Sequence, residues 1–116
     1  MRREPRAYLT DARAAIDAIG DFTRGKTFEE FTAQPLLRSA VERQLQIVGE
    51  ALAQLARLDP ALAGRIPDLP RIVAFRNILV HGYAIVDHDQ VWSAAQRRLP
   101  ELRAALERLL AEPGKA

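Results

Sequence analysis

The chain has 116 residues, of which 48% are hydrophobic and 28% charged, as is usual for one globular domain. It contains no Cys, which excludes disulfides, thiolate metal sites and a Cys nucleophile. A formal net charge of +2 permits an anionic partner without requiring one. No apolar run approaches the roughly 18 residues of a membrane span, and no apolar core follows residues 1–6 as in a secretory signal. We therefore expect a cytoplasmic protein that has no membrane partner.

The first half of the chain predicts three helices. Apolar residues recur at three- and four-residue steps over residues 6–19, and Gly20 suits the end of that helix. The segment 27–30 (TFEE) has the form of a capping box and predicts a short helix over 28–34. A long helix over 35–58 carries two adjacent apolar stripes. Such a double stripe indicates burial on two sides, as in a central bundle helix or one that also meets another subunit.

The second half predicts two more helices. Proline residues punctuate the turn that follows residue 58, and a helix over 70–81 ends at Gly82. Asp87 suits the cap of a last helix over 88–111. Pro100 lies inside this helix, so we expect a kink or break near residues 98–99.

No segment has the period of a strand. The fold class is therefore all-α, an antiparallel bundle of four to five helices. We expect one domain over residues 1–116, with residues 112–116 as a frayed tail.

One stretch near the end of the helix over 70–81 concentrates functional side chains among apolar ones: Arg76-Asn77-Ile78-Leu79-Val80-His81-Gly82-Tyr83. On a helical wheel Arg76 and Tyr83 fall on one side, and Asn77 and His81 on the next. Ile78 and Leu79 point away from these residues, toward the expected core. The polar side chains thus form a broad face.

This set of side chains suits phosphodiester chemistry. Arg76 can neutralise a phosphoryl group that gains charge in a transition state, and His81 can accept or donate a proton. Asn77 can orient the imidazole or a substrate oxygen, and Tyr83 can stack on a base, bind phosphate or be modified. The RNA 2′-OH is a built-in nucleophile, so a base and a cation suffice for cleavage without a metal. The expected products carry a 2′,3′-cyclic phosphate, or its hydrolysed form, and a 5′-OH.

Each of these residues also has a purely structural interpretation. His81 can be a surface residue, Arg76 an ion-pair partner, Asn77 a backbone cap and Tyr83 a half-buried aromatic. The sequence contains no paired-His metal spacing, so we expect no metal site and no cofactor.

Two residues of the long helix stand out against its apolar stripes. Gly49 lies mid-helix, where it costs roughly 1 kcal/mol relative to Ala, so we expect another group to approach closely there. Glu50 is predicted to be a buried or semi-buried ion-pair partner of an arginine, with Arg76 and Arg43 as candidates.

The order R-x4-H-x-Y, formed by Arg76, His81 and Tyr83 with Asn77 after the Arg, resembles the motif of the HepT-like HEPN toxins. Further similarity lies in the segments AYLTD (7–11), FTRG (22–25), FEEF (28–31), AVER (40–43), IVGEA (47–51), VD (86–87) and VW (91–92). R-x4-H alone is a weak pattern, but the combination in this order is specific.

The resemblance implies an all-α HEPN-like fold that dimerises through its long helices, with two R-x4-H motifs facing one cleft. It implies an endoribonuclease toxin with Arg76 and His81 as the catalytic pair and Asn77 as a supporting residue. It also implies a cognate minimal nucleotidyltransferase (MNT) antitoxin, which neutralises the toxin by binding it, by AMPylation of Tyr83, or by both. The alternative is a non-catalytic helical dimer that binds nucleotide or the nucleotidyltransferase.

Overall fold

A computed structural model describes residues 3–82, 84 and 86–113. The part of the chain that it describes is helical and contains no strand, which confirms the all-α bundle. The elements in chain order are α1 (Pro5–Thr23), α2 (Phe28–Ala33), α3 (Pro35–Leu58), α4 (Pro60–Ala63), α5 (Leu69–His81), α6 (His88–Ser93), the π-helical turn η2 (Ala94–Arg98) and α7 (Leu99–Ala111).

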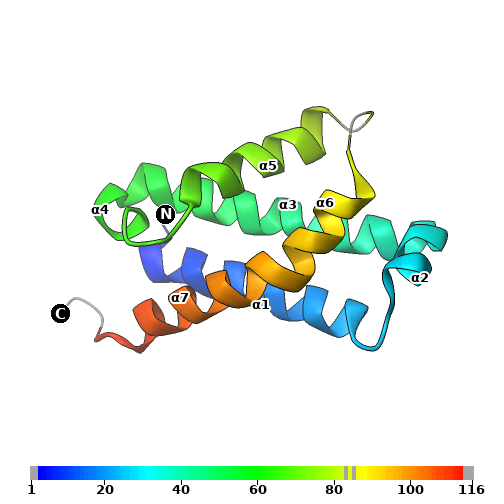
Figure 1. Cartoon of the computed structure of the whole chain (residues 1–116). Helices are drawn as coiled ribbons and strands as arrows, with labels where there is room; N and C mark the ends of the chain where they lie inside the picture. The colour runs from blue at the N-terminus through cyan, green and yellow to red at the C-terminus, as the bar shows by residue number, and fades with distance from the viewer. Residues whose placement is uncertain (1–2, 83, 85, 114–116) are drawn as a thin grey trace.

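Helix α3 lies at the centre, with α1 on one side and α5 on another, and the segment α6–η2–α7 crosses the bundle diagonally (Figure 1). The long helices α1, α3, α5 and α7 alternate in direction (Figure 1). The two apolar stripes of α3 are thus explained within one chain, because α1 and α5 each cover part of the helix. Leu36, at the start of the second stripe, is the exception and is 84% exposed.

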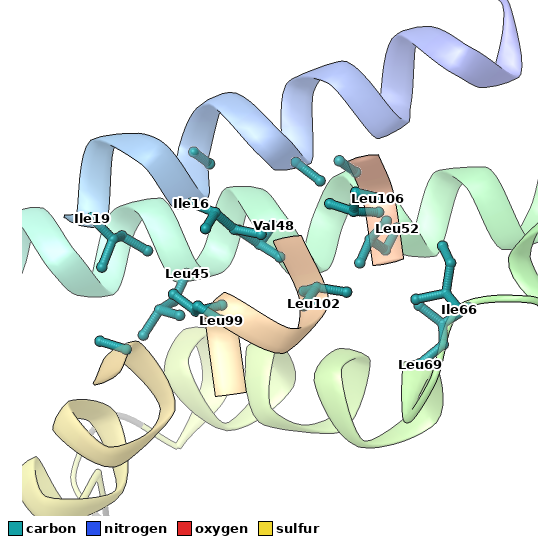
Figure 2. Packing of buried hydrophobic residues seen from close by; sticks show 14 of the residues in the cluster. Ile16, Ile19, Leu45, Val48, Leu52, Ile66, Leu69, Leu99, Leu102 and Leu106 are labelled. Carbon is teal, nitrogen blue, oxygen red and sulfur yellow. The ribbon is translucent and has the colours of Figure 1, made fainter. Parts of the chain in front are cut away.

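The core is formed by apolar side chains that meet between the long helices. Figure 2 shows Ile16 of α1, Leu45 and Val48 of α3, and Leu99 and Leu102 of α7 packed in one cluster. At one end, Phe31 of α2 packs against Trp92 of α6, with ring centroids 5.2 Å apart. Burying a large apolar side chain contributes about 1.5–3 kcal/mol, so this core supplies the main driving force of the fold.

Arginine side chains tie the helices together at the surface. Arg6 donates to the backbone carbonyls of Leu109 (3.3 Å) and Glu112 (3.0 Å), which satisfies acceptors left open at the end of α7. Arg103 of α7 donates to both carboxylate oxygens of Asp17 on α1, at 2.6 and 3.2 Å. Part of the arginine content therefore serves to hold α7 against α1.

Two predictions about the helix ends and turns need correction, and a third is confirmed. Helix α1 does not end at Gly20 but continues to Thr23, whose buried hydroxyl donates to the Ile19 carbonyl at 2.8 Å. The turn after α3 contains the short helix α4, because the Asp59 side chain accepts from the Leu62 N–H at 3.0 Å. The last helix is divided by η2 ahead of Pro100, as the proline predicted.

Candidate functional site

The candidate site is built where α5 crosses α3 at Gly49. A Cβ atom placed on Gly49 would lie 2.3 Å from Arg76 Cβ and 2.7 Å from Arg76 Cγ. These are not the flexible end of the side chain, so α5 could not keep its position against a larger residue. The predicted close approach at Gly49 is confirmed, and the group that approaches is the stem of Arg76.

The Arg76 guanidinium is positioned by polar neighbours on two helices. Its Nη1 donates to Asn77 Oδ1 at 2.7 Å. Its Nη2 lies 3.8 Å from Glu50 Oε1, and Arg43 Nη1 lies 3.9 Å from the same oxygen. Glu50 therefore pairs with both of the arginines that the sequence offered as alternatives. The seven-residue spacing of Arg43 and Glu50 is the sequence signal, since two helical turns return to the same face.

These contacts leave the guanidinium available to a ligand. The Arg76 side chain is 27% exposed, and both distances to Glu50 exceed hydrogen-bond length. Arg76 Nε is buried and has no hydrogen-bond partner within the described residues. A half-exposed carboxylate at this distance attracts the guanidinium weakly. A phosphate, which can take bidentate hydrogen bonds from Arg, would compete with it effectively.

His81 lies in the last turn of α5 and is exposed. Asn77, four residues earlier, shares its helix face and is also exposed. Among residues 3–82, 84 and 86–113, no hydrogen bond or ion pair joins His81 to Arg76 or Asn77. One chain thus joins Arg76 to Asn77 by a hydrogen bond, whereas the exposed His81 is hydrogen-bonded to neither of them. Tyr83 lies outside the described residues, so its place remains a prediction.

The apolar residues of the motif are only partly buried. Leu79 is buried as expected, but Ile78 is 38% exposed and does not point into the core. The reason is geometric. Helix α5 packs on α3 through the side that carries Leu79, and a residue one position away is turned by about 100°. Ile78 therefore lies with Asn77 and His81 on the outer side of α5.

The described residues contain neither a candidate metal site nor a helix that could span a membrane. No group of three or more His, Cys, Asp or Glu in the described ranges could hold a metal ion. No described helix is long and apolar enough to cross a membrane.

The fold and the site define a class of small all-helical proteins in which one helix presents an arginine, an amide and a histidine. Comparison with known proteins makes the class specific. The model of the family "Ribonuclease HepT-like" matches residues 12–109. The chain therefore belongs to the HepT-like ribonuclease family, and its class of enzyme is ribonuclease.

Curated relatives agree with the family match. A protein of Thermococcus cleftensis, provisionally named ribonuclease HepT, is 33% identical over 113 residues, which cover 94% of this chain and 98% of that protein. A protein of Methanocaldococcus jannaschii, provisionally named an RNase, is 29% identical over 111 residues, which cover 94% of this chain and 93% of the relative. No solved structure gives a significant match.

Proposed function

We propose that this protein is the toxin of a HEPN/MNT toxin–antitoxin system and cleaves RNA in the cytoplasm as a metal-independent endoribonuclease. The observation that carries the proposal is the setting of Arg76. Its stem rests on Gly49, its guanidinium is held by Asn77 and approached by Glu50, and the side chain remains 27% exposed. Family membership supports RNA as the substrate class.

In the proposed reaction, the RNA 2′-oxygen attacks the adjacent phosphorus while the P–O5′ bond breaks. A His81 imidazole takes the 2′-OH proton, and an imidazolium returns a proton to the leaving 5′-oxygen. Arg76 stabilises the charge that develops on the non-bridging oxygens. Asn77 keeps the guanidinium turned toward them. The products are a 2′,3′-cyclic phosphate and a 5′-OH.

We further propose that the active unit is a homodimer. Within one copy no hydrogen bond joins the exposed His81 to Arg76, and a second copy can supply the converging groups across a shared cleft. The outer side of α5 supports this arrangement, because it exposes the apolar Ile78 between polar residues of the motif. Such a cleft would contain two Arg76 and two His81 side chains, which provides both a proton acceptor and a proton donor.

Neutralisation is proposed to require a cognate nucleotidyltransferase that binds the toxin, transfers AMP to Tyr83, or does both. Tyr83 follows Gly82 directly after α5, next to the motif in sequence. An AMP group there would add negative charge and bulk two residues from His81 in the sequence. Mass spectrometry of protein co-expressed with a candidate MNT nucleotidyltransferase tests this. A mass gain of one or more AMP units should be absent from the Tyr83→Phe variant.

The activity itself is tested with purified variants. We expect Arg76→Ala and His81→Ala to abolish RNA cleavage and growth arrest while the helical circular dichroism is retained. His88→Gln and Arg108→Ala are the matched controls, since they change the other histidine and an exposed arginine on α7. Both controls should cleave like the wild type. Full cleavage by His81→Ala would overturn the proposal.

A further inference from the structure

A groove of ≈ 360 Å³ lies between α1 and α3 and shares a residue with the candidate site. It is lined by Arg3, Tyr8 and Asp11 near the start of the chain and by Ile47, Glu50, Ala51 and Gln54 of α3. Glu50 is also the carboxylate that faces Arg76 and Arg43. The volume falls within the range of small-ligand sites. The groove and the proposed phosphate position therefore adjoin one another.

The walls of the groove suit a flat ring. The Arg3 guanidinium lies over the Tyr8 ring, 4.8 Å from its centroid, so an aromatic ring and a guanidinium group are stacked at the edge of the groove. Ile47 and Ala51 contribute apolar contacts from α3. Nucleobases stack on aromatic rings and on guanidinium planes in this way.

The polar residues at the rim of the groove determine which hydrogen-bonding edge of a nucleobase can bind there. Asp11 and Glu50 are carboxylates, which accept hydrogen bonds and repel phosphate. Asp11 holds Arg3 Nη1 at 2.6 Å, whereas the Glu50 contacts are longer than hydrogen bonds. Glu50 can therefore accept from a ligand, and Gln54 can both donate and accept. Guanine fits best, because its N1–H and exocyclic amino group donate side by side. Uracil offers a single N–H between two carbonyls.

We propose that this groove is the base subsite of the ribonuclease and binds a nucleobase with a donor edge, guanine foremost. The inference rests on the proposed function, because a base held beside Glu50 would deliver its own phosphate to Arg76 and Arg43. The base and the phosphate of a nucleotide are separated by one ribose, and Glu50 lies 3.8 Å from the Arg76 guanidinium. The groove would thus set which residue of the RNA flanks the cut.

Binding without cleavage tests the subsite. The dimeric His81→Ala protein, labelled with ¹⁵N, is titrated with GMP, AMP, CMP and UMP, and the amide shifts are followed. GMP should bind most tightly and UMP most weakly, with shifts on α1 and α3 around the groove. In this background Asp11→Asn should weaken GMP binding about tenfold, because it removes the charged hydrogen bond that holds Arg3 over Tyr8. Tyr8→Leu should weaken it at least about fivefold, as for loss of a stacking partner.

Two variants on the same helix are matched controls. Asp21→Asn removes a carboxylate that pairs with Arg24, and Phe22→Leu removes an exposed ring, both away from the groove. Neither should change GMP binding. Equal binding of UMP and GMP, unchanged binding by Asp11→Asn, or a groove that shows no shifts because a second copy covers it would each overturn the subsite.

This outcome is separable from that of the proposed function. If the wild-type protein cleaves RNA but shows no base preference and no amide shift changes around the groove, the proposed activity stands and the subsite is refuted. If the protein binds GMP in the groove but does not cleave RNA, the groove is a nucleotide site and the proposed function is refuted.

Discussion

At the scale of single residues, Gly49 has the clearest structural role. The alternative, that it is an incidental glycine in an Ala-rich helix, does not account for the 2.3 Å between its missing Cβ position and Arg76 Cβ. Gly49 lets α5 approach α3 closely enough for Arg76 to reach Glu50. Gly49, which has no side chain of its own, therefore determines the position of Arg76, the proposed catalytic residue.

We expect Gly49→Ala to destabilise the protein and to reduce cleavage. Overpacking in a tight contact costs about 1–3 kcal/mol, which exceeds the gain of about 1 kcal/mol in helix propensity. Gly20→Ala is the matched control, because Gly20 lies in α1 with nothing within 4 Å of its Cβ position. That variant should be slightly more stable than the wild type. Urea denaturation measures the free energy of unfolding of both variants. An equal increase in that free energy for Gly49→Ala and Gly20→Ala would contradict the role of Gly49.

At the scale of elements, an ion pair joins α1 to α7. The hydrogen bond from Arg103 holds the pKa of the Asp17 carboxyl below its ordinary value. Because this pKa is lower in the folded state than in the unfolded state, the stabilisation is present above the unfolded pKa and is lost as the pH falls through the folded one. Both side chains are about half exposed, so the effect should be small.

Asp17→Asn should therefore lower the melting temperature slightly near neutral pH and leave it unchanged in acid below the carboxyl titration. Asp21→Asn is the control, since Asp21 pairs with Arg24 within the same turn region and joins no second helix. Thermal melts at the two pH values give the comparison. A difference between wild type and Asp17→Asn that persists in acid would show that the loss is one of packing.

The elements also show what the sequence could predict. The bounds of α3 and the capping box of α2 follow from local signals, and both are confirmed. The predicted end of α1, at residue 19 with Gly20 as the cap, was wrong. The apolar stripe stops at Ile19, but the helix continues to Thr23, whose side chain is buried. Pro100 predicted the break, but the π-helical form of η2 depends on a hydrogen bond from the Leu99 N–H to the Ala94 carbonyl.

The candidate site was predictable in its residues but not in its geometry. The pairing of Glu50 with arginine could be inferred, because an isolated carboxylate on an apolar helix needs a partner. The exposure of Ile78 could not, since the wheel gives angles within one helix and not the side on which a neighbour packs. The groove between α1 and α3 could not be predicted from the sequence either, because only the packing of α1 on α3 brings Tyr8 and Asp11 close to Glu50.

At the scale of the whole molecule, the proposed composite site needs two copies of the chain. The exposed Ile78 lies on the side of α5 that carries Asn77 and His81. We expect Ile78→Asp to convert the dimer to a monomer that keeps its helical content and loses cleavage in proportion to the dimer lost. Ala104→Asp, on the exposed side of α7, should remain dimeric and active. Sedimentation analysis beside an RNA assay checks this, and an active Ile78→Asp monomer would refute the composite site.

The central claim is that Arg76 and His81 cleave RNA by attack of the 2′-OH without a metal. The most direct measurement is the end chemistry of RNA cut by the purified protein in excess EDTA. We expect fragments that end in a 2′,3′-cyclic phosphate and begin with a 5′-OH, and no cleavage of a substrate with 2′-deoxy nucleotides throughout. Fragments with 5′-phosphate ends, or cleavage that disappears with EDTA and returns with a divalent cation, would contradict it.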